Sequence, residues 1–185
     1  MKPLHAPLLC MPSIPVGEKH PGSFGYVRRH DVHTGIDLYA PVGSPVFAME
    51  EGKVIEKAWF TGEKIGMSWW ENTRAVYIEG ESGVFNYGEI VEHHTLKVGD
   101  TVSRGEFIGH VVQVLKNYKG RPMSMLHLEL YDHGYIDDWG PWEVGQPKPE
   151  HLKNPTDLIL ERVDGAKPCM VDHYQEICKL VGKGE

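Results

Sequence analysis

Residues 33–48 read HTGIDLYAPVGSPVFA, and this stretch carries the main signal for the fold. Its β-branched and aromatic residues form short runs separated by glycine and proline, which is typical of strands joined by tight turns. The pattern V-G-x-x-V at 42–46 returns at 98–102, and another glycine and another β run follow in both places. The stretch therefore predicts two similar hairpin units packed as a sandwich or small barrel.

The rest of the chain continues this pattern, with 21 glycines and 13 prolines between runs rich in Val, Ile, Phe and Tyr. We expect strands over residues 36–39, 45–49, 53–59, 74–79, 83–87, 106–115 and 125–131, and long loops over 61–73 and 132–149. Helix is expected only near the end, over 154–162 and again over 170–181. The predicted fold class is mostly β, an antiparallel β-sandwich with short C-terminal helices.

Length and charge bound the class of protein. A chain of 185 residues with 41% hydrophobic content can bury one substantial core, so one domain is expected. The formal charge of -7 argues against nucleic acid or an anionic membrane as a partner. No segment approaches the roughly 20 apolar residues of a membrane span, and the broken apolar start is no clear signal peptide. We therefore expect the protein to be made in the cytoplasm as a soluble product.

The cysteines, Cys10, Cys169 and Cys178, are odd in number and far apart. Such spacing argues against a disulfide framework and against a thiolate zinc site. We expect free thiols that are buried or idle.

His33 and Asp37 form an H-x-x-x-D pair in a predicted strand or loop. Because side chains alternate along a strand, both project to the same side, with Gly35 between them leaving space for an ion. His127 is the best candidate for a third ligand, since alternating leucines mark the opposite, buried face of its strand. Imidazole and carboxylate groups suit zinc, and three protein ligands leave one position for water. A single histidine is more often a surface or core residue, so these positions alone leave both interpretations open.

Residues 28–48 resemble the first signature of the lysostaphin/LytM-type zinc metallopeptidases, in which H-x-G-x-D precedes a-p-x-G-x-p-V-x-A. Residues 97–109, KVGDTVSRGEFIG, are similar to a second family pattern, V-G-d-x-V-x-x-G-q-x-I-G, and Asn154-Pro155 resembles its closing segment. The resemblance implies the duplicated hybrid motif, a barrel-sandwich hybrid, and assigns zinc to His33, Asp37 and His127. It divides the chain into an N-terminal extension (1–20), a peptidase-like domain (21–160) and a helical C-terminal extension (161–185).

The chain departs from the family at both histidines that do not bind the metal. Met125 replaces the first histidine of the family's H-x-H, and YGEI at 87–90 replaces its Y-x-H-L, which puts Glu89 in the histidine position. A carboxylate can accept a proton from zinc-bound water, whose pKa the metal lowers to roughly 7, so Glu89 is the predicted general base. Other candidates for the missing groups are His30, His93, His94 and Glu129.

The resemblance implies a zinc-dependent endopeptidase that hydrolyses peptide bonds in peptidoglycan stems or cross-bridges, with zinc-bound water as nucleophile. Tyr87, Trp69 and Trp70 would then border the substrate groove, although half-buried packing is also common for loop tryptophans. The alternative is a catalytically inactive zinc-binding domain that recognises cell wall or serves as a structural module of a phage particle or secretion assembly. A biotinyl- or lipoyl-type carrier is disfavoured, because the chain lacks the D-K-A or M-K-M tripeptide of that class.

The expected partner is a peptidoglycan peptide, which lies outside the cytoplasm. With no clear signal peptide, we expect the protein to act in the periplasm or at the cell wall after lysis, injection or secretion. A variant branch of the family, in phage and secreted-effector proteins, resembles this chain in combining Y-G-E with M-L-H.

Overall fold

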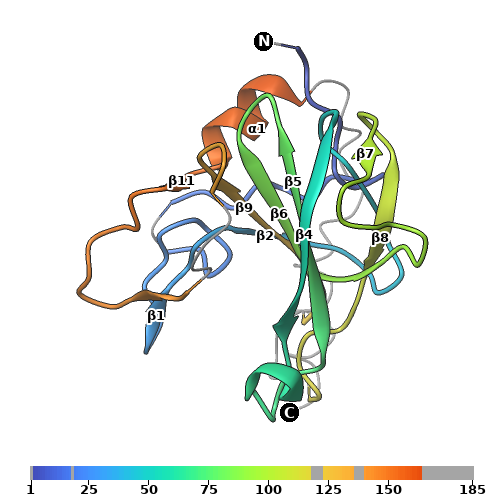
Figure 1. Ribbon diagram of the computed structural model, residues 1–185. Helices are drawn as coiled ribbons and strands as arrows, with labels where there is room; N and C mark the ends of the chain where they lie inside the picture. The colour runs from blue at the N-terminus through green and yellow to red at the C-terminus, as the bar shows by residue number, and fades with distance from the viewer. Residues whose placement is uncertain (1, 18, 118–122, 136–139, 164–185) are drawn as a thin grey trace.

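The computed structural model describes residues 2–17, 19–117, 123–135 and 140–163, which form an antiparallel β body with one short α-helix (Figure 1). In chain order the elements are β1 (Asp31–Val32), β2 (Ile36–Tyr39), β3 (Pro45–Phe47), β4 (Gly52–Thr61), the 3-10 helix η1 (Glu63–Ile65), β5 (Thr73–Gly80), β6 (Val84–Glu92), β7 (Thr101–Val102), β8 (Phe107–Val111), β9 (Met125–Tyr131), β10 (Trp142–Glu143), β11 (Leu152–Lys153) and α1 (Thr156–Arg162).

Strands β9 and β6 lie inside a nine-stranded sheet whose main path runs β11-β9-β6-β5-β4-β7. One edge of β9 pairs with β6, and the other pairs with β2 and β11. One edge of β6 pairs with β5, while the other pairs with β9 over residues 84–88 and with β8 over residues 90–92. The change of partner on β6 therefore falls at Glu89.

The two V-G-x-x-V stretches form interlocking turns. The strand after the first turn, β3, pairs with β8, and the strand after the second turn, β7, pairs with β4. The Gly43 N–H donates to the Val111 carbonyl at 2.8 Å, and the Gly99 N–H donates to the Val54 carbonyl at 2.8 Å. Both glycines have positive φ, 86° and 97°, which glycine adopts without steric cost. Each hairpin unit thus completes the other, and the predicted mostly β, duplicated architecture is confirmed.

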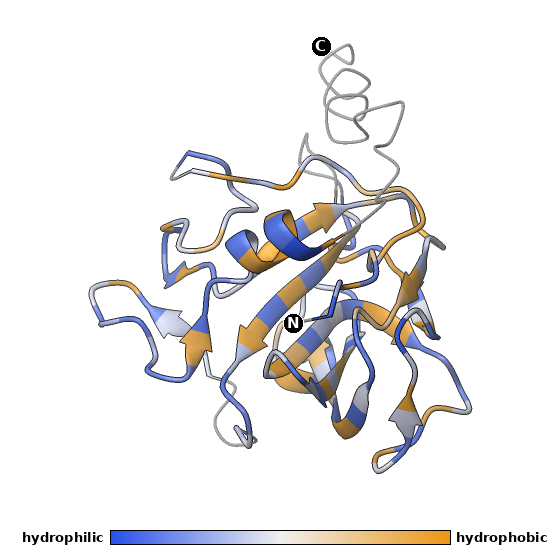
Figure 2. Ribbon diagram, turned by 90° about the horizontal axis from the view of Figure 1, so that it is seen from above, coloured by the Kyte–Doolittle hydropathy of each residue, from blue (hydrophilic) through white to orange (hydrophobic). Residues whose placement is uncertain are grey.

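The main core is built from alternate apolar side chains of the central strands, and Figure 2 shows this alternation of hydropathy along them. Leu4 and Leu8 are also fully buried in this core, and the Leu4 N–H donates to the Arg162 carbonyl at 2.7 Å. Burying a leucine side chain contributes roughly 2 kcal/mol. The segment predicted as an N-terminal extension therefore stabilises the β body.

Each of the seven predicted strands overlaps an observed strand, and those at 36–39 and 125–131 have the predicted bounds. The structure adds β1, β7, β10 and β11, because two-residue strands carry no detectable period. The predicted loop over 61–73 contains η1, and α1 ends at Arg162 as expected. The helix predicted over 170–181 lies outside the described residues. None of the described helices is long and apolar enough to cross a membrane.

Cys10 is disulfide-bonded, so the prediction of a free thiol is wrong for this residue. Cys169 and Cys178 lie outside the described residues. A disulfide requires two cysteines whose Cα atoms lie within about 7 Å, and the fold decides that proximity. Spacing along the chain could not reveal it.

Candidate metal centre

The three predicted metal ligands come from one pair of strands and the turn before it. Asp37 lies on β2 directly opposite His127 on β9. His33 precedes β2, and its N–H donates to the Tyr26 carbonyl at 2.9 Å. Opposite residues of an antiparallel pair have Cβ atoms about 5 Å apart, so the register itself brings Asp37 and His127 together.

Gly35 lets β2 approach β9 closely. A Cβ at this position would lie 2.4 Å from the Leu128 carbonyl oxygen and 2.9 Å from Glu129 Cγ. The glycine therefore makes room for the backbone of β9, rather than for an ion as the sequence suggested. A larger residue would push apart the two segments that carry the candidate ligands.

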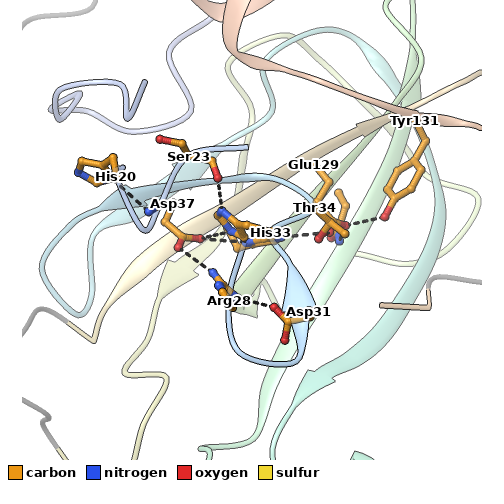
Figure 3. Close-up of polar contacts among 12 residues, drawn as sticks. His20, Ser23, Arg28, Asp31, His33, Thr34, Asp37, Glu129 and Tyr131 are labelled. Carbon is orange, nitrogen blue, oxygen red and sulfur yellow. Dashed lines mark hydrogen bonds and ion pairs between the residues drawn. The ribbon is translucent and has the colours of Figure 1, made fainter. Parts of the chain in front are cut away.

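The candidate ligand atoms lie close together, and Figure 3 shows the Asp37 carboxyl group pointing toward the ring of His33. His33 Nε2 lies 3.0 Å from Asp37 Oδ1 and 3.1 Å from His127 Nδ1. His127 Nδ1 lies 2.9 Å from the same carboxylate oxygen. All three residues are buried. Within the described ranges, no other group of three or more His, Cys, Asp and Glu side chains is arranged to hold a metal ion.

Hydrogen bonds on the far side of each imidazole set its tautomer. His33 Nδ1–H donates to the Ser23 carbonyl at 2.8 Å, and His127 Nε2–H donates to Glu129 Oε1 at 3.1 Å. When both imidazoles are neutral, as metal binding requires, the nitrogens facing Asp37 carry the lone pairs. A proton can bridge only two of the three converging acceptors, whereas a metal cation satisfies all of them. The donor set fits zinc, for which two imidazoles and one carboxylate are common ligands.

Glu129 is held by a buried network and does not face the ligand atoms as a free acid. Its Oε2 accepts hydrogen bonds from Asn86 Nδ2 at 2.5 Å and from the Tyr131 hydroxyl at 2.9 Å, and Thr34 donates to Oε1. Burial would raise the pKa of Glu129, but these bonds and the one from His127 outweigh it and lower the pKa to about 2. Glu129 therefore orients His127 and does not replace a missing catalytic histidine.

The carboxylates around His127 create a strongly negative field. Burial alone would lower the pKa of His127, but its hydrogen bonds to Asp37 and Glu129 outweigh burial and raise the pKa to about 10. Burial would likewise raise the pKa of Asp37, yet the charge of His33 and the bond to His127 hold it far below its usual value. Such a field attracts a cation to this point.

Glu89 occupies a break in the pairing of β6. Gly88 is opposite His127, and the register of β5 with β6 shifts between Arg74 and Val76, which leaves Glu89 in a bulge. Its φ is 61°, and it is the one residue other than glycine with positive φ among those the structure describes. A left-handed backbone costs a glutamate roughly 1 to 2 kcal/mol, and such strain clusters at functional sites.

The Glu89 carboxyl group is buried without a hydrogen-bond partner for Oε2. Burial, followed by the nearby charge of Asp37, raises the pKa of Glu89 to about 8. A buried polar atom without a partner is rare and costs about 1 to 3 kcal/mol. Glu89 thus has the position and the pKa expected of a proton acceptor near neutral pH.

The ligands and Glu89 line one cavity of about 720 Å³. Trp69 and Trp70, from the loop that follows η1, also line this cavity. Trp142 on β10 also lines the cavity, and β10 pairs with β1. Two loops that are distant in sequence therefore bring apolar side chains to the same cavity.

The structure does not bring Tyr87 to this cavity. Tyr87 is fully buried in the main core, where its hydroxyl accepts a hydrogen bond from the Met49 N–H at 2.9 Å. Strand alternation would put Tyr87 and Glu89 on the same face. The bulge breaks that alternation, so Tyr87 packs in the core and Glu89 faces the ligands.

The remaining sequence candidates lie elsewhere or cannot transfer protons. His30, His93 and His94 do not line the cavity, and the rings of His93 and His94 pack on each other with centroids 4.6 Å apart. Met125 lines the cavity but has no titratable group. Sequence reasoning assigned no role to Arg28 or to the Ser23 carbonyl, because no local pattern marks a residue that joins the site through a turn.

Known proteins resemble this chain in sequence and in fold. Peptidase family M23 matches residues 31–138, more than half of the 185-residue chain. Lysostaphin of Staphylococcus simulans is 30% identical over 81 residues, which cover 42% of this chain and 14% of that protein. The chain thus matches only a small part of its curated relatives.

Solved structures share the fold. Lysostaphin from Staphylococcus simulans aligns with a TM-score of 0.59 at 18% identity, over 92% of this chain and 58% of that one. LytU aligns with a TM-score of 0.51 at 21% identity, over 83% of this chain and 88% of that one. The family match includes all three candidate metal ligands and Glu89, and the chain belongs to peptidase family M23.

Proposed function

We propose that this protein is a zinc-dependent endopeptidase that hydrolyses peptide bonds in peptidoglycan, with Glu89 as its general base. One observation supports this proposal above the others. Two imidazole nitrogens and a carboxylate oxygen converge within about 3.1 Å, and the same cavity is lined by Glu89, which has a strained backbone and a buried Oε2 without a hydrogen-bond partner. A purely structural metal site would not require Glu89 in this conformation.

His33, Asp37 and His127 would hold the zinc ion. When bound, zinc supplies Lewis acidity, which polarises a carbonyl group and lowers the pKa of water. The residues of this chain keep the ligand atoms in place: Ser23 and Glu129 fix the imidazole tautomers. Their role follows from geometry, since each holds the ring nitrogen opposite the ligand atom.

Glu89 moves the proton. Its carboxylate accepts a proton from the attacking water as the new C–O bond forms, and then delivers that proton to the leaving amine nitrogen as the C–N bond breaks. A pKa near 8 makes the group easy to protonate, and a bound cation would lower that pKa toward neutral.

The substrate assignment draws on the family and on the cavity. A solved relative is described as an antimicrobial peptidase, and the cavity of this chain has room for several residues of an extended peptide. The disulfide at Cys10 favours an oxidising compartment outside the cytosol. The protein would therefore act in the periplasm or at the cell wall.

Digestion of purified peptidoglycan sacculi tests the proposal. Wild-type protein with one equivalent of zinc should release soluble muropeptides with new amino termini, and chelation should stop the release. Glu89→Gln should lose about 10² to 10⁴-fold in rate while it retains zinc. Glu51→Gln, at an exposed position outside the cavity, is the matched control and should retain full activity.

Two results would contradict the proposal. If zinc-loaded wild-type protein cleaves no sacculi from any source, the protein is better interpreted as a catalytically inactive zinc-binding domain. Met125 at the histidine position favours that interpretation. If Glu89→Gln retains wild-type turnover, the assignment of the base is wrong.

A further inference from the structure

Arg28 brings a permanent positive charge to the cavity. No other lysine or arginine lines it in the part of the chain that the structure describes, whereas Asp31, Asp37, Glu89 and Glu129 all do. Its guanidinium lies close enough to Glu89 to lower the pKa of that carboxyl, against the larger effect of burial. Arg28 is thus positioned within reach of both the ligand set and the proposed base.

The backbone at Arg28 is fixed by a tight hairpin. The Arg28 N–H donates to the Asp31 carbonyl at 2.8 Å, and Val27 bridges to Val32. The following strand, β1, is in turn paired with β10. The guanidinium therefore extends from an ordered turn toward Asp37, as Figure 3 shows.

The guanidinium itself is loosely held. Its Nη2 lies 3.5 Å from Asp37 Oδ2, and its Nη1 lies 3.8 Å from Asp31 Oδ1. Charge-assisted hydrogen bonds of this type are normally 2.7–2.9 Å long, so these are ion pairs without close hydrogen bonds. Within the described residues the side chain of Arg28 makes no hydrogen bond, and 38% of it is exposed. Its five N–H donors remain available to a ligand in the cavity.

Amide hydrolysis needs a hydrogen-bond donor beside the carbonyl oxygen, and Arg28 brings N–H donors to the cavity that the candidate ligands line. When water adds to the carbonyl carbon, the π electron pair of the C=O bond moves onto oxygen, which becomes negatively charged. Met125 has no N–H or O–H group to stabilise this charge. Tyr26, Tyr39 and Tyr77 also line the cavity, but neutral donors are roughly half as strong as charged ones.

We propose that Arg28 donates a hydrogen bond to the carbonyl oxygen of the scissile amide and stabilises its developing negative charge. This inference rests on the proposed function. The C–O bond forms as the carbonyl π pair moves onto the oxygen beside Arg28, while Glu89 takes the proton of water. The pair then returns to re-form C=O, the C–N bond breaks, and Glu89 gives its proton to the departing nitrogen. The two residues thus replace the two histidines that this chain lacks.

Kinetics on sacculi with zinc-loaded protein separate this role from others. Arg28→Gln should lower kcat by about 10² to 10³-fold with KM nearly unchanged, the cost of losing one oxyanion donor. Arg28→Lys, which keeps the charge, should recover part of that loss. Arg29→Gln is the matched control, because Arg29 is exposed and does not line the cavity. Zinc content and zinc affinity should be the same in all four proteins.

Inorganic phosphate gives a readout that does not depend on turnover. Phosphate is a tetrahedral oxyanion, so it should bind the zinc-loaded wild-type protein in calorimetry. Binding should weaken about tenfold or more in Arg28→Gln and remain unchanged in Arg29→Gln. This measurement tests Arg28 even if the protein proves to cleave nothing, and so distinguishes failure of this inference from failure of the proposed function.

Two outcomes would overturn the inference. If Arg28→Gln retains both wild-type kcat and wild-type phosphate affinity, Arg28 does not contact the oxyanion. If Arg28→Gln instead loses zinc affinity, Arg28 acts on Asp37 as a positioning residue for the metal ligand.

Discussion

Strands β2 and β9 hold two of the three candidate metal ligands, Asp37 and His127, through regular pairing, whereas β6 holds Glu89 at a break in pairing. Asp37 and His127 are direct partners in an unbroken register, and their backbones are ordinary β conformation. Glu89 lies where β6 changes partner from β9 to β8, and its φ is 61°. The cavity therefore combines an unstrained part and a strained part, one strand apart.

This difference indicates a division of roles. Metal ligands must keep fixed distances, and paired strands give them rigid positions at no backbone cost. Burial beside the charge of Asp37 disfavours the ionised Glu89 carboxyl group, and the left-handed backbone of Glu89 adds roughly 1 to 2 kcal/mol of local strain.

The largest effect is expected from removal of a ligand on the regular strands. Asp37→Ala should eliminate both zinc binding and hydrolysis, because two imidazoles alone do not complete the ligand set. Metal analysis after dialysis and muropeptide release measure the two effects. Zinc retained at one equivalent in this variant would show that the cation binds elsewhere.

A smaller effect is expected from the group that orients His127. Glu129→Gln keeps the shape of the side chain but removes the charge that accepts from His127 Nε2–H. Second-layer changes of this kind cost about 10 to 100-fold in metal affinity, and competition with a chelator should show that loss. Tyr131→Phe, which removes one of the hydrogen bonds to Glu129, should have a weaker effect. Equal affinities in Glu129→Gln and wild type would contradict this role.

The strained strand gives a pH effect in the metal-free protein. Because the pKa of Glu89 is raised from 4.5 to about 8, the folded state binds more protons than the unfolded state between these values. Its contribution to stability is complete below pH 4.5 and is lost as the pH rises toward 8. Between pH 5 and about 6.5, the melting temperature of chelator-treated Glu89→Gln should therefore fall less than that of chelator-treated wild type. This range lies below the pH at which titration of His127 also changes the stability. If the melting temperatures of wild type and Glu89→Gln fall equally with pH over this range, the pKa of Glu89 is not raised.

The smallest effect separates backbone strain from charge. Glu89→Gly removes both the positive-φ cost and the buried carboxyl, whereas Glu89→Gln removes only the charge. Glu89→Gly should therefore be more stable than Glu89→Gln by about 1 kcal/mol in urea denaturation, with both variants inactive. A glycine variant less stable than the glutamine variant would mean that the bulge imposes no strain.

The strand pattern and the grouping of His33, Asp37 and His127 could be predicted from sequence, since both follow from short-range periodicity. Alternation over residues 125–131 puts His127 opposite the leucine face, and spacing of four puts Asp37 near His33. Local conformation decides such features, so they are readable one segment at a time. The roles of β1 and β10 were not readable, because two residues carry no period.

Sequence alone also determined that a carboxylate replaces a histidine at position 89, but only the tertiary structure decided where it points. The bulge in the pairing of β6 with β5 coincides with the change of partner from β9 to β8 on the other edge of β6, and β8 and β9 are distant in the chain from Glu89. The same holds for Arg28, which joins the cavity through a turn, for Tyr87, which packs in the core, and for Cys10, whose pairing depends on proximity in the fold. Periodicity is a local property, whereas side-chain direction at a break in a sheet depends on long-range pairing.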